Sequence, residues 1–336
     1  MNILVTGASG FVGSWLANML LDQNRVPQFF RGAQVRILAR SAKSVASLEL
    51  KGAKIFIGDV SDASSVTRAS EGADFVFHLA GVVGYSKADR PIMQQVNVDG
   101  TQHVVDAIQN SKCKRLVHMS SVAAVGASID GRNILNENSP FNLSHLNLGY
   151  FETKRAAEQA VLAAVSSKKI DAVVLNPSNI YGPGDAQKGS RSTQIKVARG
   201  QFKYYTSGGV SIVHVEEVCR ALLNAATHGR NGERYILSGE NIRIREMFEL
   251  IAGCAGVAAP KIHLPDIVVR GLASLGEFLE RRGRKGPVAS ESARASLLYH
   301  WFDSKKAQTE LGFVVRPAKE CINDSVMWMK SNGVIN

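Results

Sequence analysis

A chain of 336 residues, 45% of them hydrophobic and 21% charged, has the balance of a globular protein and the length of one large domain or two coupled ones. No apolar run approaches the roughly 18 residues of a membrane span, and no basic leader precedes the first apolar run, so we expect a cytoplasmic protein. The net charge of +11 comes without a recognisable nucleic-acid-binding motif, which argues against nucleic acid as a partner and leaves anionic small molecules and an anionic membrane surface.

The first predicted strand leads into a glycine-rich turn. The apolar run 3–5 is typical of a buried parallel strand, three glycines follow, and an amphipathic helix is predicted over 11–22. Glycine permits a tight turn and a close approach of the backbone to a phosphate, and the open N–H groups of a helix start bind anions. The stretch therefore predicts a site for the phosphates of a dinucleotide. Its residues are Gly7, Gly10, Phe11, Val12 and Gly13.

Apolar runs and helical periods alternate from residue 2 to residue 176. This alternation predicts strand–helix–strand units, and hence an α/β fold with a doubly wound parallel sheet. The predicted strands are 3–5, 35–39, 54–57, 74–80, 115–119 and 171–175, and the predicted helices lie near 11–22, 62–70, 92–110 and 150–165.

After residue 185 the alternation loosens, which predicts a smaller C-terminal α+β lobe built on the carboxyl end of the sheet. We expect a first domain over 1–184 and a substrate-binding lobe over 185–336, with segments near 211–230 returning to the first domain. Strands are predicted near 201–206, 211–215 and 233–237, and helices near 215–227, 243–254, 266–282, 304–311 and 317–331.

The end of the second predicted strand carries Arg40. In doubly wound sheets this place recognises the adenosine ribose, with an acidic side chain for the 2′-hydroxyl of NAD or a cation for the 2′-phosphate of NADP. Arg40 therefore predicts NADP as the preferred cofactor. The alternative is that Arg40 simply faces solvent and the cofactor is NAD.

The next two strand ends offer further cofactor contacts. Asp59, followed by Val60, is a candidate acceptor for the adenine amino group. The small residues Ala80 and Gly81, after Leu79, let the backbone pass close to the cofactor.

Two polar residues between these strands have different expected roles. Asn97 lies in a helical stretch, where a buried amide can bind the backbone of the neighbouring strand and so shape the cofactor site. His78 is expected to be a core histidine with satisfied hydrogen bonds. Neither the eight histidines nor the four cysteines show ligand spacing, so we expect free thiols and no metal.

The fifth predicted strand ends in Ser120 and Ser121, and the next helix carries Tyr150 and Lys154 one turn apart. A nearby lysine cation favours the phenolate and lowers a tyrosine pKa that is ordinarily near 10. Such a tyrosine can exchange a proton with a substrate oxygen while hydride moves to or from a nicotinamide. A serine at the strand end can orient that oxygen. We therefore predict Ser121, Tyr150 and Lys154 as catalytic residues.

Taken together, the motifs resemble the extended short-chain dehydrogenase/reductases, the superfamily of Rossmann-fold, NAD-dependent epimerases and dehydratases. The resemblance covers most of the chain, and it implies the catalytic roles above and nicotinamide contacts from Pro177, Ser178 and Ile180. The motifs are T-G-x-x-G-F-x-G at 6–13, G-D-V at 58–60, H-L-A-G at 78–81, N-V-x-G-T at 97–101, S-S at 120–121, Y-x-x-x-K at 150–154 and P-S-N-I-Y-G-P-G at 177–184.

Some details resemble the dihydroflavonol reductase and 3β-hydroxysteroid dehydrogenase branch. Asn176 stands where sugar-nucleotide enzymes more often carry arginine, and Val125 stands where they often carry tyrosine. The expected function is an NAD(P)-dependent oxidoreductase that interconverts a ketone or aldehyde and a secondary alcohol on a largely apolar small molecule. The alternative is a sugar-nucleotide epimerase or dehydratase with tightly bound NAD. Monomer and homodimer both remain open.

The C-terminal half supplies candidate walls for the substrate, namely Phe202, Tyr204, Tyr205 and the helix 266–282. That helix gathers Val268, Leu272, Leu275 and Leu279 on one face, and a basic cluster follows it at 281–285. One hypothesis is a helix that touches a membrane or admits an apolar substrate. We favour the simpler one, in which the apolar face packs on the lobe and the basic loop is solvated.

Overall fold

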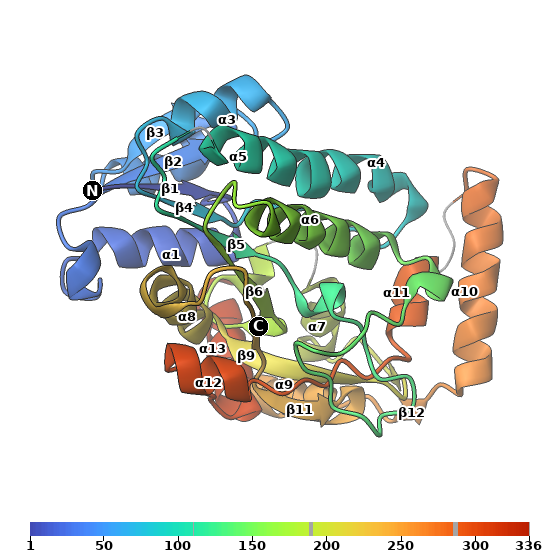
Figure 1. The fold of residues 1–336 in the computed structure, drawn as a ribbon. Coiled ribbons are helices and arrows are strands. Elements are labelled where there is room, and N and C mark those ends of the chain that lie inside the picture. The colour runs from blue at the N-terminus through green and yellow to red at the C-terminus, as the bar shows by residue number, and fades with distance from the viewer. Residues whose placement is uncertain (110, 188–190, 285–287, 336) are drawn as a thin grey trace.

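The computed structural model describes residues 1–109, 111–187, 191–284 and 288–335. Its centre is a parallel sheet of seven strands in the order β10-β6-β5-β4-β1-β2-β3 (Figure 1). Six strands match the predicted alternation, so the α/β doubly wound sheet is confirmed. The bounds are β1 Asn2–Thr6, β2 Gln34–Ala39, β3 Lys54–Ile57, β4 Phe75–His78, β5 Arg115–Met119, β6 Ala172–Pro177 and β10 Arg234–Leu237.

Helices cover both faces of this sheet, which buries its apolar strands on each side. One face packs in a single core with α1 (Phe11–Leu21), α8 (Val215–His228) and α12 (Lys305–Leu311). The other face packs against α3 (Ala63–Ser70), α5 (Gly100–Gln109) and α6 (Gly149–Ser166). In the view of Figure 1 these two layers lie below and above the sheet.

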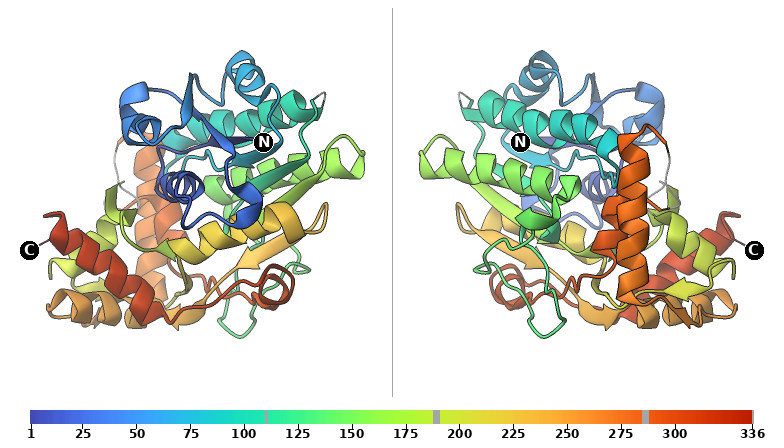
Figure 2. Two further views of the ribbon diagram at one scale, coloured as in Figure 1. Left: turned by 90° about the vertical axis from the view of Figure 1, so that its left-hand side faces the viewer. Right: turned by 90° about the vertical axis from the view of Figure 1, so that its right-hand side faces the viewer.

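A second body lies beyond the carboxyl ends of the strands (Figure 2). Its core joins two small sheets to helices of the C-terminal half. One sheet has the order β11-β9-β7, and the other pairs β12 with β8. The bounds are β7 Asn179–Tyr181, β8 Tyr204–Tyr205, β9 Gly209–His214, β11 Glu240–Arg243, β12 Ile262–His263, α7 Ser192–Ala198, α9 Ile244–Ala255 and α13 Ala318–Ser331.

The helix α10 (Asp266–Arg281) stands at the outside of the molecule and packs on the short α11 (Ser290–Ala295) (Figure 1). The remaining helical elements are short. They are α2 Ala46–Glu49, α4 Arg90–Met93, six 3₁₀ turns at Gln28–Phe30, Ala42–Val45, Lys87–Asp89, Val122–Ala124, Ser144–Leu146 and Asp185–Gln187, and one π-helical turn at Gln94–Asp99.

Three segments differ from expectation. The strand predicted near 233–237 is β10, and it extends the main sheet beside β6 instead of belonging to the lobe. The long helix predicted over 92–110 is α4 and α5 joined by the π-helical turn, which contains Asn97. The helix α10 buries Val269, Ala273 and Gly276, not the bulky residues on the face that the sequence predicted to pack.

Candidate active site

The glycine turn brings β1, β4 and α1 into close contact. Gly7 has φ +76°, and a Cβ there would lie 2.6 Å from the backbone nitrogen of Ala80. A Cβ on Gly13 would lie 2.2 Å from the carbonyl oxygen of Gly7, so only glycine lets α1 pack this tightly on the turn. Gly10 is the N-cap of α1 and supplies no side-chain cap, which leaves amide groups at Phe11 and Val12 for an external anion.

The segment after β6 returns to this turn. Indole Nε1 of Trp15 in α1 donates to the carbonyl of Pro183 at 2.9 Å, which ties the helix to the P-S-N-I-Y-G-P-G segment. Within that segment Pro177 is the last residue of β6, and Ile180 lies in β7. The hydroxyl of Ser178 is buried and has no partner among the described residues. The start of α1 has no side-chain cap, and the Ser178 hydroxyl has no hydrogen-bond partner among the described residues. Free polar groups of this kind at the carboxyl edge of the sheet fit a bound dinucleotide.

Asn97 shapes the loop after β4. Its Oδ1 accepts from the backbone nitrogen of Val82 at 2.7 Å, and its Nδ2 donates to the Val82 carbonyl at 2.9 Å and to Thr153 Oγ1 at 3.2 Å. The Asn97 amide thus joins the loop that contains Leu79, Ala80 and Gly81 to the helix α6. It bonds to the backbone beside a neighbouring strand, as expected.

His78 is a satisfied core histidine, as predicted. Its Nδ1 lies 2.7 Å from Thr6 Oγ1 and its Nε2 lies 3.0 Å from Thr101 Oγ1. Burial lowers its pKa to about 3, so the ring is neutral at physiological pH.

Arg40 and Asp59 face each other at the far end of the candidate cofactor site. The guanidinium Nε lies 3.8 Å from one carboxylate oxygen, and the Arg40 side chain is 77% exposed. The other Asp59 oxygen accepts from the backbone nitrogen and the hydroxyl of Ser61, both at 2.9 Å. Val60 is buried under Gly100 of α5. An exposed guanidinium held beside this edge can reach an anionic group on a ribose.

The three predicted catalytic residues meet at the carboxyl end of β5. Ser121 follows the strand, and its Oγ accepts from the backbone nitrogen of Ala123 at 3.1 Å. Tyr150 lies in the first turn of α6, and the Ser121 hydroxyl is close enough to its phenol to lower the pKa of Tyr150. Lys154 is buried one turn later, and its Nζ donates to the carbonyl of Met119 at 2.9 Å.

The protonation of this group differs from the expected direction. Burial raises the pKa of Tyr150 to about 12, although the Ser121 hydroxyl opposes the shift. Lys154 follows one turn later on the same helix. Its own pKa is lowered to about 8 by burial, and the Glu158 carboxylate works against that shift. In the protein alone desolvation therefore outweighs the lysine charge, and the phenol keeps its proton at neutral pH.

A buried polar network behind the triad was not predicted. Asn176 Nδ2 donates to the backbone carbonyl of Ser121 at 2.9 Å and to Glu158 at 2.6 Å. Arg234 on β10 donates to the other oxygen of Glu158 at 2.8 Å. Glu158 lies four residues after Lys154, a spacing that places both on one side of α6. The network fixes the end of β5 that carries Ser121.

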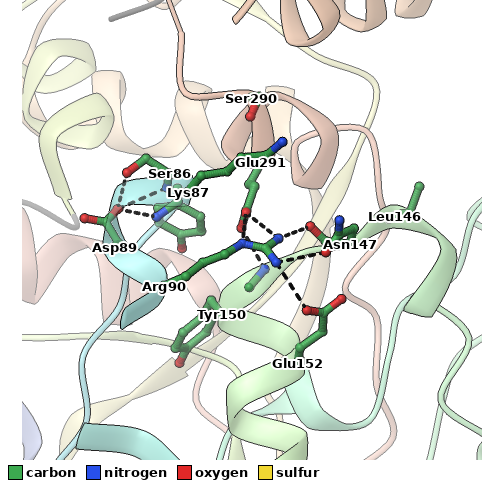
Figure 3. A network of polar contacts seen from close by, with 12 residues as sticks. Ser86, Lys87, Asp89, Arg90, Leu146, Asn147, Tyr150, Glu152, Ser290 and Glu291 are labelled. Atoms are coloured by element: carbon green, nitrogen blue, oxygen red, sulfur yellow. Dashed lines mark hydrogen bonds and ion pairs between the residues drawn. The ribbon is translucent and has the colours of Figure 1, made fainter. Parts of the chain in front are cut away.

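A second network holds the start of α6, just before Tyr150 (Figure 3). Glu291 of α11 is 3% exposed, and its carboxylate accepts from the backbone nitrogen of Gly149 at 2.8 Å. Arg90 donates to the same carboxylate at 2.8 and 3.1 Å and to Asn147 Oδ1 at 2.9 Å. An acidic group at the N-terminus of α6 satisfies an open amide and complements the helix dipole just before Tyr150.

The predicted aromatic walls are distributed differently. Phe202 packs against Phe248 inside the core of the second body, while Tyr204 and Tyr205 form the short strand β8. The aromatic side chain beside Tyr150 is Tyr85, from the loop after β4, with ring centroids 6.4 Å apart. That loop carried no sequence signal that set Tyr85 apart from an ordinary surface tyrosine.

Two of the basic residues between 188 and 203, both arginines, have hydrogen-bond partners in the described part of the chain. Arg191 is buried, donates to the carbonyl of Ile180 and lies 3.5 Å from Asp185. Arg199 donates to the carbonyl of Val334. Lys196 and Lys203 are exposed, and Lys188 lies outside the described residues.

The sheet, the glycine turn and the strand-end residues define a dinucleotide-binding α/β enzyme. The chain belongs to the NAD-dependent epimerase/dehydratase family, whose model matches residues 3–238. The resemblance found in the sequence motifs is therefore confirmed.

Three curated relatives are each 30% identical to the chain. Sterol demethylase protein B of Methylococcus capsulatus is matched over 100% of both chains. The putative dihydroflavonol 4-reductase of Synechocystis is matched over 98% of this chain and 95% of its own length. The 4-hydroxy-2-methyl-3-oxo-4-farnesyl-3,4-dihydroquinoline-1-oxide ketoreductase of Stigmatella aurantiaca is matched over 94% and 92%.

A solved structure agrees with this assignment. The crystal structure of gox2253 has a TM-score of 0.84 and 32% identity, and the match covers 99% of each chain.

Among the described residues, no helix is both long and apolar enough to span a bilayer.

Proposed function

We propose that the protein is an NADP(H)-dependent reductase or dehydrogenase that interconverts an apolar ketone or aldehyde with its secondary alcohol. The observation that carries the proposal is the meeting of Ser121, Tyr150 and Lys154 at the end of β5, beside the glycine turn. The residues proposed to hold the cofactor are Gly7, Gly10, Phe11, Val12, Gly13, Arg40, Asp59, Val60, Leu79, Ala80, Gly81, Asn97, Tyr150, Lys154, Pro177, Ser178 and Ile180.

The chemistry divides among three side chains. The nicotinamide, when bound, supplies or accepts the hydride. Ser121 donates a hydrogen bond that orients the carbonyl oxygen, and Tyr150 transfers its phenolic proton to that oxygen during reduction. The raised pKa of Tyr150, about 12, keeps this proton in place at neutral pH. Lys154 binds the nicotinamide ribose and, in its charged form, stabilises the phenolate that the proton transfer leaves.

Three observations favour an apolar substrate. Tyr85 lies beside Tyr150, and Tyr150 packs against a hydrophobic cluster that contains Phe141, Phe151 and Leu298. Arg191 and Arg199, which could have held a diphosphate, donate to backbone carbonyls instead. Two of the relatives carry names of sterol and farnesyl-quinoline chemistry.

The substrate class is tested by turnover and thermal shift with NADPH. Ketosteroids, flavonoid ketones, small aldehydes and UDP- or dTDP-sugars are compared. We expect reduction of at least one apolar ketone, and a higher melting temperature with that ligand because it binds only the folded protein. Stabilisation by sugar nucleotides alone, together with NAD that stays bound through dialysis, would support an epimerase or dehydratase instead.

The cofactor preference is tested at Arg40. The Arg40→Asp variant is expected to lose roughly tenfold to hundredfold in affinity for NADPH, because a guanidinium bound to a phosphate is replaced by a repelling carboxylate. Affinity for NADH should stay equal or rise. Fluorescence titration with both cofactors measures the change. Arg31→Asp, an exposed site before the amino end of β2, is the matched control. Equal affinities of the unmodified protein for NADPH and NADH would refute the NADP assignment.

The role of Glu158 as a positioning residue is tested by a pH profile. Its carboxylate raises the pKa of Lys154, so Glu158→Gln lowers that pKa further below the present value of about 8. Since Lys154 is charged only below its pKa, the alkaline fall in kcat/KM should move to lower pH.

Glu152→Gln is the matched control for this profile, because Glu152 lies on the same helix with its side chain 39% exposed. The control should leave the alkaline limb in place. A Glu158→Gln variant with an unmoved limb and only a reduced melting temperature would show a purely structural role.

A further inference from the structure

The helix α10 turns its small residues inward and its bulky apolar residues outward. Val269, Ala273 and Gly276 are buried against α11 and its surroundings, and a Cβ on Gly276 would lie 2.7 Å from the carbonyl oxygen of Val288. The side chains on the opposite side are exposed. They are Ile267 at 80%, Val268 at 44%, Leu275 at 47% and Phe278 at 49%. We call these four residues the α10 stripe.

The charged side chains of α10 are divided in the same way, with the acidic ones toward the protein and the basic ones toward solvent. Each of its acidic residues has a partner on the protein side. Asp266 accepts from Ser207, Glu280 accepts from Ser290, and Glu277 pairs with Lys87 and Arg294. The basic residues are exposed beside the stripe or just beyond it. They are Arg270, Arg282, Arg284 and Arg281, the last of which also pairs with Glu277 at 2.9 Å, and Lys285 lies outside the described residues.

One of these cations is built into the stripe itself. The guanidinium carbon of Arg282 lies 4.1 Å from the ring centroid of Phe278, so the aromatic ring and the charge are presented together. The outward surface of α10 is therefore apolar along its length and cationic at its end. An interfacial helix on an anionic bilayer needs this pattern, because the stripe enters the acyl boundary while the arginines meet the headgroups.

The protein-facing side of α10 is linked to the candidate active site through the loop after β4. Lys87 Nζ pairs with Glu277 of α10 at 2.9 Å, and two residues before Lys87 is Tyr85, whose ring lies beside Tyr150. In Figure 1 the helix stands at the outer edge of the molecule, beyond the amino end of α6. A surface that met a bilayer here would place the loop of Tyr85 at the same interface.

We infer that α10 docks the protein onto an anionic lipid surface, so that an apolar substrate reaches Tyr150 directly from the bilayer. The lipid binding itself is inferred from the α10 stripe and the neighbouring arginines. Only the delivery of an apolar substrate from the bilayer rests on the proposed function. Other occupants of the stripe, such as a second copy of the chain, would leave the outward arginines facing like charge.

The experiment is co-sedimentation of the full chain with two kinds of vesicle, phosphatidylcholine alone and phosphatidylcholine with about 30% phosphatidylglycerol. The unmodified protein should sediment with the anionic vesicles and much less with the neutral ones. A Leu275→Glu, Phe278→Glu double variant should lower binding by roughly tenfold or more. An Arg282→Gln, Arg284→Gln double variant should weaken binding to the anionic vesicles only.

Val314→Glu is the matched control, because Val314 is 58% exposed and lies between α12 and α13, away from α10. It should bind vesicles like the unmodified protein. Unchanged binding by the Leu275→Glu, Phe278→Glu variant would overturn the inference. The inference would also be overturned if the unmodified protein bound no vesicles and instead formed a dimer in solution that the Leu275→Glu, Phe278→Glu variant dissociates. Vesicle binding without reduction of any ketone would leave the docking intact and refute the proposed function.

Discussion

Tyr150→Phe is expected to lower kcat for carbonyl reduction about a thousandfold, with NADPH affinity nearly unchanged. The variant removes only the phenolic oxygen, so the ring keeps its packing beside Tyr85 and Phe151. Steady-state kinetics and a fluorescence titration of NADPH measure the two quantities separately.

Tyr235→Phe is the matched control for this loss. It also removes one phenolic oxygen, but that oxygen contacts Glu310 and the backbone of Arg230. Its kcat should remain within about twofold, because the change lies outside the proton-transfer path. If Tyr150→Phe kept more than a small part of its activity, another group would have to supply the proton.

Gly7→Ala is expected to destabilise the protein by about 3 kcal/mol and to weaken cofactor binding strongly. The added methyl group would lie 2.6 to 2.8 Å from the backbone of Leu79 and Ala80, where real Cβ atoms are not found. Either β4 or the turn must move, and both moves displace the start of α1 from the phosphates. Urea unfolding and NADPH titration measure the two effects.

Gly32→Ala is the matched control for Gly7→Ala. It shows how much unfolding free energy is lost through the backbone conformation alone, without a steric clash. Gly32 has φ +71°, near the +76° of Gly7, but a Cβ there meets nothing within 4 Å. The control should lose only about 1 kcal/mol from the left-handed conformation. Equal losses for the two variants would show that the contact with Leu79 and Ala80 relaxes at no cost.

The sequence predicted the parts of the fold that depend on local patterns. Buried parallel strands are short apolar runs, so six strands of the main sheet were found from hydropathy alone. The glycine spacing likewise predicted the tight turn after β1, because the strand, the turn and the helix start lie within a dozen residues. The site residues on these elements follow from the topology, which brings the carboxyl ends of the strands to one edge.

Features that depend on distant partners could not be predicted. An apolar run such as Tyr235 to Leu237 looks alike in either sheet, so its place beside β6 was missed. The pattern of α10 indicated one apolar face and gave no reason for small residues to pack while Leu275 and Phe278 stay outside. The link from Asn176 to Glu158 joins two elements whose side-chain directions depend on the assembled core.

The cap on α6 also has a consequence for the order of events during synthesis. The backbone amide of Gly149 donates its hydrogen bond to a carboxylate that lies 142 residues later in the chain. The first turn of α6, with Tyr150, is thus translated long before Glu291 leaves the ribosome. Domains generally begin to fold as they emerge, so a nascent chain can assemble most of its sheet while α6 is still uncapped. The hydrogen bond that caps the turn of Tyr150 therefore forms only near the end of translation.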